Sequence, residues 1–158
     1  MAIEVIGINE LLVALQQAGP RVERGVATKM LKGAEQIATL ARSYAPVDEG
    51  NLERAIKVAT DSSGTGGRRV VAVYVDPTVA AGSDNTVGDY ALKMHEGVYN
   101  LGPKSLMKEL SSGKKVGRKY LSRAFKELSD NVFQSMVAKT RRLLRSRNLF
   151  SPLDILDD

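Results

Sequence analysis

Residues 45–56, with the sequence APVDEGNLERAI, constrain the fold most, because they separate a long helical pattern from short apolar runs that are typical of strands. Pro46 disfavours the helical conformation for the residue before it, so the preceding helix is expected to end there. Asp48 is expected to cap the next turn. Gly50 supplies backbone freedom just before Leu52 begins a new apolar pattern. The stretch therefore predicts a corner between a long helix and a sheet.

Two helices are expected before this corner. Asn9 resembles an N-cap for a short helix over residues 10–18, and Gly19-Pro20 is expected to separate it from a second helix over residues 21–44. Apolar residues recur in the second helix at steps of three and four, which predicts one packed face. These residues are Val26, Met30, Ala34, Ile37, Ala41 and Tyr44. Its many small residues would let its own sheet or another subunit approach closely.

Two strands are expected after the corner, over residues 55–60 and 68–75, joined by a polar and glycine-rich connection. The second strand is apolar on both faces, which predicts either a central strand or one that lies against a partner. Residues 90–97 are expected to form a short helical or extended segment. Residues 98–117 are interpreted as a long loop around one helical turn near Leu106, and loops of this length are usually functional or mobile.

The last long element is a helix predicted over residues 118–147. Its apolar stripe consists of Leu121, Phe125, Leu128, Val132, Met136 and Leu143. Such a helix would be about 45 Å long, which is more than a domain of this size covers, so part of it is expected to pack on other chains. The fold class is therefore α+β, with long N-terminal and C-terminal helices packed on a small, mostly antiparallel β-sheet. Residues 1–150 are expected to form a single domain, followed by an acidic C-terminal tail at residues 151–158.

Composition narrows the class of protein. The 158 residues include no cysteine, which excludes disulfides and thiolate metal sites. No window approaches the roughly 18 uninterrupted apolar residues of a membrane span, and the first seven residues lack the pattern of a signal peptide. A soluble protein made in a cytoplasm, without a membrane partner, is expected.

The net charge of +5 is concentrated near the C-terminus. Residues 114–147 hold eleven Lys or Arg residues and only two acidic ones. Three interpretations are open: a solvated or intersubunit face, contact with DNA that passes nearby, and specific DNA binding. Aromatic residues are scarce, which argues against stacking on single-stranded bases. The candidate contact residues are Lys114, Lys115, Lys139, Arg141, Arg142, Arg145 and Arg147.

The sequence offers little catalytic chemistry. His95 is the only histidine, and no nucleophile-elbow pattern accompanies it, so packing or a subunit contact explains it better than catalysis. The carboxylates Asp48, Glu49 and Glu53 crowd the corner, but capping explains the first of them without acid–base chemistry. The glycine-rich segments lack the P-loop spacing. We therefore predict no catalytic, cofactor-binding or metal-binding residues.

Three blocks together resemble one family. Residues 45–52 resemble the signature that follows the long helix in tail-completion, or head–tail joining, proteins of long-tailed bacteriophages, a group that includes the lambdoid minor tail protein Z. The matching corner residues are Pro46, Asp48, Gly50 and Leu52. A second block, YALKMHEG at residues 90–97, is similar to the family's Tyr-Ala-x-x-x-Glu-Gly segment through Tyr90, Glu96 and Gly97. A third, KYLSRA at residues 119–124, resembles the start of the final helix.

The resemblance implies a structural virion protein without catalysis or cofactors. Such a protein would be assembled in the host cytoplasm and would lie in the virion neck as a homo-oligomeric ring, most often six-fold. Its partners would be the head connector and the tail terminator or tail tube proteins, with loose contact to packaged DNA. On this view residues 61–67 and 104–117 would be mobile and would order against neighbouring rings. The alternative is a non-specific DNA-binding module that uses the basic C-terminal helix.

Overall fold

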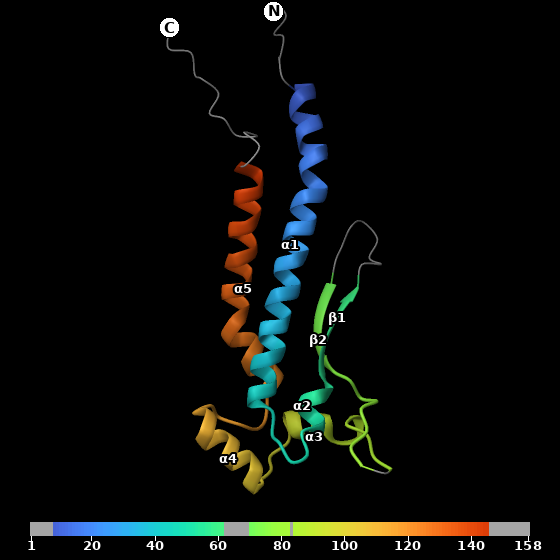
Figure 1. Cartoon of the computed structure of the whole chain (residues 1–158), viewed down its shortest axis with the longest axis vertical. Helices are drawn as coiled ribbons and strands as arrows, with labels where there is room; N and C mark the ends of the chain where they lie inside the picture. The colour runs from blue at the N-terminus through green and yellow to red at the C-terminus, as the bar shows by residue number, and fades with distance from the viewer. Residues whose placement is uncertain (1–7, 62–69, 83, 146–158) are drawn as a thin grey trace, which may run out of the picture. The chain divides into compact units, whose positions relative to one another are not determined.

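The computed structural model describes residues 8–61, 70–82 and 84–145, and the side chains among them from residue 19 on, except that of Asp61. The elements are α1 (Ile8–Tyr44), α2 (Asn51–Ala55), β1 (Ile56–Asp61), β2 (Val70–Val75), α3 (Gly88–Glu96), α4 (Pro103–Ser112) and α5 (Tyr120–Arg145) (Figure 1). The predicted α+β class, with long terminal helices and a small antiparallel sheet, is confirmed. The acidic tail, Arg147 and most of the glycine-rich connection lie outside the described residues.

The chain divides into two compact units, and the long helices contribute to both. The first unit is Leu31–Asn131 and contains the corner, the two strands, α3 and α4. The second combines Met1–Met30 with Val132–Asp158. The single-domain organisation stays a prediction.

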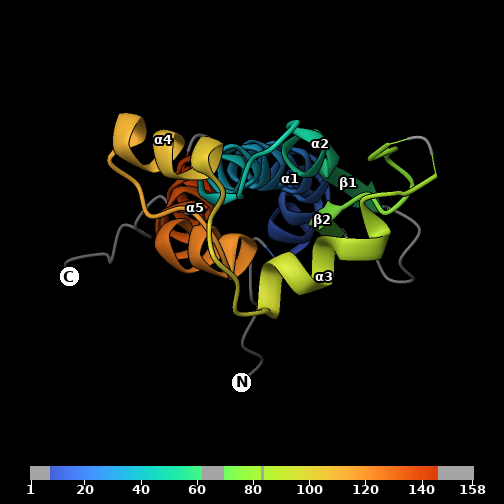
Figure 2. The ribbon, with the colours of Figure 1, turned by 90° about the horizontal axis from the view of Figure 1, so that it is seen from below.

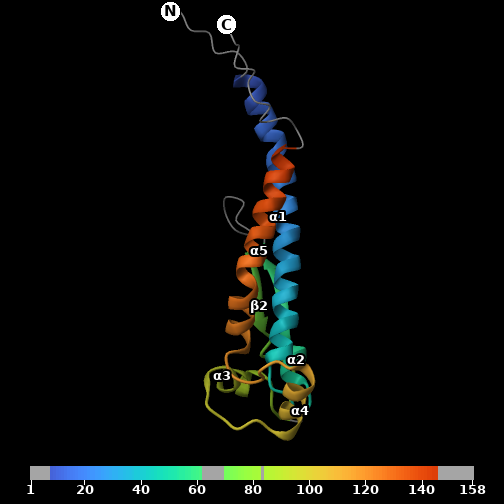
Figure 3. The same ribbon diagram turned by 90° about the vertical axis from the view of Figure 1, so that its left-hand side faces the viewer.

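The core of the unit Leu31–Asn131 forms where the end of α1 meets the corner. The buried residues of α1 are Ala34, Ile37, Ala38, Leu40, Ala41 and Tyr44. They are joined by Leu52, Ala55 and Ile56 from the corner and by Val87, Val116, Tyr120 and Ala124 from later segments. The predicted apolar face of the helix is thus confirmed over its last three turns. Figures 2 and 3 show α2, α3 and α4 gathered around this end of α1.

The sheet consists of two antiparallel strands in the described part of the chain. Ile56 pairs with Val75 and Asp61 pairs with Val70. Side chains of β2 alternate between half-buried and exposed, and its exposed face carries Val70 and Tyr74. The interpretation of β2 as a central strand is therefore wrong, because among the described residues β2 has a neighbouring strand on one edge only. The alternative, that β2 lies against a partner, stays open.

Two helical predictions also need correction. The break expected at Gly19-Pro20 is absent, because α1 runs through Pro20 without interruption. Proline removes one backbone hydrogen bond, but helical segments on both sides keep the register. The interpretation of residues 98–117 as a loop with one turn is wrong as well, because Pro103–Ser112 form three turns of helix. Gly102 precedes this helix and Gly113, with φ of 65°, ends it, as expected of helix-boundary residues.

Five of the six residues of the predicted α5 stripe are half-buried, namely Leu121, Leu128, Val132, Met136 and Leu143, but the sixth is exposed and the most buried residues lie beside the stripe. Phe125 is 61% exposed, whereas Tyr120 and Ala124 are buried. Polar contacts with Tyr44 of α1 explain why this side of α5 faces inward. The Tyr44 hydroxyl donates a hydrogen bond to Glu127, and the Arg123 guanidinium lies 4.7 Å from the Tyr44 ring centroid. These contacts turn the Tyr120, Ala124 and Glu127 side of α5 towards α1.

In the second unit, α1 and α5 approach each other at Gly25. A methyl group in place of its hydrogen would collide with the side chain of Leu143 and would crowd that of Lys139. The small size of Gly25 is therefore what lets the two helices pack closely there. Among the described helices, none has the length and apolar character that crossing a membrane requires.

Candidate functional site: the cavity at the corner

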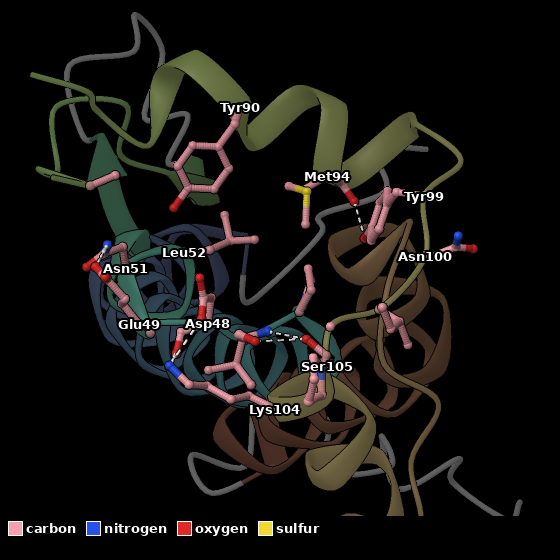
Figure 4. Close-up of a pocket in the computed structure, with 17 residues that line it drawn as sticks. Asp48, Glu49, Asn51, Leu52, Tyr90, Met94, Tyr99, Asn100, Lys104 and Ser105 are labelled. Carbon is pink, nitrogen blue, oxygen red and sulfur yellow. Dashed lines mark hydrogen bonds and ion pairs between the residues drawn. The ribbon is translucent and has the colours of Figure 1, made fainter.

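The corner borders a cavity of about 630 Å³. One wall consists of residues 46–52, the opposite wall consists of residues 99–105, and Ala81, Tyr90 and Met94 complete the lining (Figure 4). Two of the three family-like blocks therefore meet at one place, because the corner signature and Tyr90 of the second block line the same space. Figure 4 shows the Tyr90 and Met94 side chains, from α3, directed across the cavity towards Leu52.

The backbone at the cavity wall turns at Gly50, whose φ is 79°. This left-handed conformation is unfavourable for other residues, which explains the glycine of the signature. The predicted capping role of Asp48 is wrong, because Gly50 occupies the N-cap of α2 and no side chain caps that helix. Asp48 instead accepts a hydrogen bond from Lys104, at 2.7 Å to its carbonyl oxygen and 3.1 Å to its carboxylate. A one-turn helix such as α2 needs no side-chain cap once a glycine sets its entry.

Lys108 of α4 fixes the end of α1. Its ammonium donates hydrogen bonds to the carbonyl oxygens of Arg42 at 2.6 Å and Ala45 at 2.7 Å, and it forms an ion pair with Glu53 of α2. The final carbonyls of a helix have no partner within it, so a half-buried helix end needs donors from elsewhere. Lys108 therefore ties three consecutive segments of the corner to α4.

Backbone contacts complete this attachment. The Ser105 hydroxyl both donates to the carbonyl oxygen of Val47 and accepts from its amide, each at 2.9 Å. The amide of Gly117 donates to the carbonyl oxygen of Tyr44 at 2.9 Å. The wall formed by α4 is thus anchored on the corner, contrary to the expectation that residues 104–117 form a mobile loop.

The chemistry of the lining suits binding. Tyr90 and Tyr99 are half-buried, and this burial raises the pKa of each phenol above its usual value, so both stay neutral at physiological pH. The Tyr99 hydroxyl donates to the carbonyl oxygen of Met94 at 2.8 Å. The carboxylates of Asp48 and Glu49 are exposed at the cavity wall. The arrangement offers an apolar floor with an acidic edge and contains no nucleophile paired with a base in the described residues.

The other residues of the second block lie beside the cavity. Gly97 ends α3 at a position where a methyl group would collide with the carbonyl oxygen of Lys93, which explains the glycine. Glu96 accepts a hydrogen bond from Nδ1 of His95 at 2.7 Å. Both functions are structural, because they end the helix and hold the histidine ring.

His95 joins α3 to the start of α5. Its carbonyl oxygen accepts a hydrogen bond from the amide of Lys119 at 2.7 Å, and its ring lies edge-on against Tyr120. Nε2 is 3.5 Å from the Ser122 hydroxyl, which is long for a hydrogen bond, and neither residue lines the cavity. The geometry supports the packing interpretation. In the part of the chain that the structure describes, no cluster of three or more His, Asp or Glu side chains could hold a metal ion.

The candidate basic residues fall into separate units. Lys114 and Lys115 belong to the unit Leu31–Asn131 and are exposed, with the Lys114 ammonium 5.8 Å from the Tyr44 ring centroid. Lys139, Arg141, Arg142 and Arg145 belong to the other unit. Of these, Lys139 is half-buried and the three arginines are exposed. Their proposed contact with DNA or a subunit stays a prediction.

Sequence reasoning missed Ser105 and Lys108, which hold the corner and α4 together. A signal for them exists. Polar residues at positions 105, 108 and 109 follow the spacing of one helical face, and they lie between a Gly-Pro pair and Gly113. That pattern marks a short helix whose polar side is the one that packs.

Comparison with known proteins supports the interpretation of the corner. Residues 9–79 match the family model described as "Bacteriophage HK97-gp10, putative tail-component". The match contains most of α1, the corner and both strands, and it ends before α3. No curated protein and no solved structure matches the chain. The predicted resemblance to proteins of phage tails is confirmed, at the level of a tail component.

Proposed function

We propose that this chain, whose residues 9–79 carry the pattern of a phage tail-component family, is a ring-forming subunit of the phage neck. In this function it completes the tail and joins it to the head connector around the DNA channel. The family match carries the proposal, because the residues that match a model described as a tail component include the corner and both strands. A structural role without catalysis is part of the same proposal.

Apolar side chains that are exposed in the described part of the chain support assembly. Val70 and Tyr74 on β2 are 42% and 38% exposed, and Phe125 and Phe133 on α5 are about 60% exposed. Scattered exposed apolar residues are ordinary, but aromatic residues on a sheet face and along a helix are typical of surfaces that bury against a partner. Contacts between two different patches of identical subunits produce a ring when the rotation between subunits closes.

The native mass of the purified protein, measured by light scattering at low and high salt, tests the ring. We expect a discrete oligomer that persists at high salt, because apolar contacts are not screened by ions. A subunit that assembles only with its neighbours would show the same oligomer after connector or tail tube protein is added. A protein that stays monomeric in all of these mixtures contradicts the proposal. In the parent phage, loss of the protein should leave filled heads and separate tails.

A DNA-binding module is the second candidate, and one observation favours it. Arg141, Arg142 and Arg145 are all exposed, and at 100° per residue they lie within about 100° on one face of α5. Three guanidinium groups on one face suit contact with duplex phosphates. Such contact is also compatible with a ring through which DNA passes.

A further inference from the structure

The helix α4 is amphipathic, but its orientation is the reverse of the usual one. Its apolar residues Leu106, Met107 and Leu110 are 48%, 71% and 85% exposed. They lie one, three and four positions apart, so they form one continuous side of the helix, which we call the outer face of α4. Surface helices of a complete domain turn such a side towards their own core.

The inward side of α4 is polar. Ser105 is buried, and Lys108 and Glu109 are half-buried. Ser105 and Lys108 bind the backbone of the corner, as described above, and Glu109 accepts a hydrogen bond from the amide of Val116 at 2.8 Å. These bonds fix the rotation of α4, so the helix cannot turn its outer face inward without losing them. The outer face therefore stays exposed and can contact a surface of another subunit.

The charges around the outer face favour one occupant. The exposed Lys114 and Lys115 follow the end of the helix, so its surroundings are basic. Two outer faces packed against each other would bring these lysines together, which like-charge repulsion disfavours. An apolar surface with an acidic edge is complementary. The corner cavity has this character, because Pro46, Val47, Leu52 and Met94 line it. The exposed Glu49 lies at its edge beside Asp48, which pairs with Lys104 of the same subunit.

We propose that the outer face of α4 in one copy of this chain docks into the corner cavity of the next copy. The contact joins two different surfaces, so repeating it produces a closed ring or a filament. A cavity of about 630 Å³ has room for several side chains, and Met107 and Leu110 are the most exposed apolar side chains of α4. The inference rests on the proposed ring and names the surfaces that form it.

Cross-linking tests this contact directly, because the chain contains no cysteine. The double variant Leu110→Cys/Glu49→Cys is treated with a short bis-maleimide after assembly. We expect a ladder of covalent oligomers that ends at the ring size, because each copy offers one group to either neighbour. A mixture of the two single variants should give dimers only. The matched control Leu92→Cys/Glu49→Cys uses a residue on α3 that is 74% exposed and lies outside the contact, and it should give no ladder.

Substitution provides an independent readout. Leu110→Ser should weaken assembly at least tenfold, because a leucine side chain that becomes buried contributes about that much to association. Leu92→Ser should leave assembly unchanged. Both residues are exposed in the single chain, so the thermal unfolding midpoint of each variant should match that of the wild type, which excludes misfolding as the cause.

The outcomes separate this inference from the proposed function. If the wild-type protein forms a discrete ring but the double variant gives no ladder, the docking inference is wrong and the ring stands. Efficient dimers from Leu110→Cys alone would show that outer faces pair with each other, which also overturns it. Cross-links from residue 110 to a different virion protein, and not to the chain itself, would assign the outer face to that protein. A wild-type protein that never assembles removes the proposed ring itself.

Discussion

At the scale of single residues, Lys108 joins α4 to the end of α1, and this predicts a large effect of its removal. Lys108→Met keeps the aliphatic stem but leaves the carbonyl oxygens of Arg42 and Ala45 and the carboxylate of Glu53 without their common donor. The side chains of Lys108 and Glu53 are largely shielded from solvent. We expect a loss of about 2–3 kcal/mol in the free energy of unfolding, measured by urea titration.

Lys104→Met is the matched control for this substitution. Lys104 also bonds to the corner, but its side chain and that of Asp48 are both mostly exposed. Exposed ion pairs contribute little, so we expect a change below about 0.5 kcal/mol. Equal effects of the two substitutions would show that α4 is not fixed through the ammonium of Lys108.

Asp76, which follows β2, predicts a dependence of stability on pH. The ammonium of Lys57, 2.6 Å away, and then the hydroxyl and amide of Thr78 lower the pKa of Asp76 to about 2. A carboxyl group with a lowered pKa stabilises the folded state above its unfolded pKa of about 3.9, and this contribution is lost as the pH falls through about 2. The contribution should therefore be complete above about pH 4 and should decline between pH 4 and 2.

Asp76→Asn should remove this part of the acid sensitivity. The urea midpoint of the variant, measured from pH 5 to pH 2.5, should fall less steeply than that of the wild type. Lys57→Met should have the same flattening effect, because it removes the main cause of the lowered pKa. Parallel curves for all three proteins would show that the ion pair between β1 and the end of β2 does not persist in solution.

Residue chemistry explains which parts of the corner were predictable. Gly50 was identified correctly, because a left-handed turn restricts the residue type and leaves a trace in the sequence. Asp48 was assigned a cap that it does not form, because capping depends on where the helix begins, and the glycine shifted that start. The partners of Lys108 lie 55 to 66 residues away, so their pairing leaves no local pattern.

At the scale of elements, Pro20 makes the N-terminal part of α1 the weak part of that helix. Proline within a helix lacks the amide that would bond to the carbonyl four residues earlier, and it costs about 3 kcal/mol relative to alanine. Pro20→Ala should therefore increase the hydrogen-exchange protection of the amides of residues 12–19. Gln36→Ala, at an exposed position within the same helix, should change protection little. Unchanged or reduced protection in the Pro20 variant would contradict this prediction.

The elements differ in how far periodicity could predict them. The end of α1 was predicted closely, because its apolar residues face a core within the same unit. Both strands were predicted to within two residues, because β-branched residues are enriched in them. The helix α4 is not predicted by periodicity, because it packs on the corner through Ser105 and Lys108 and its apolar residues are exposed. Its apolar residues are visible in the sequence, but no surface among the described residues covers them.

At the scale of the whole molecule, sequence reasoning recovered the fold class and the resemblance to phage tail proteins more completely than it recovered the site. The three blocks were recognised in order, but the convergence of the first two at one cavity was not predicted. Tyr90 meets the corner only because α3 packs across from residues 46–52, and that packing depends on contacts far apart in the chain. The cavity between them is formed by segments that are far apart in the chain, so it leaves no local pattern in the sequence.

The basic end of α5 leads to the last prediction, which concerns DNA. If Arg141, Arg142 and Arg145 contact duplex phosphates, log Kd should rise with log salt concentration, and replacing all three by glutamine should reduce this slope by nearly one unit per arginine. Fluorescence anisotropy with a random duplex at several salt concentrations measures both values. The matched control replaces three exposed basic residues of the other unit, Lys32, Arg118 and Lys126. Since both variants lose the same charge, equal slopes would assign any DNA binding to net charge alone, and a lower slope in the first variant only would place the DNA against α5.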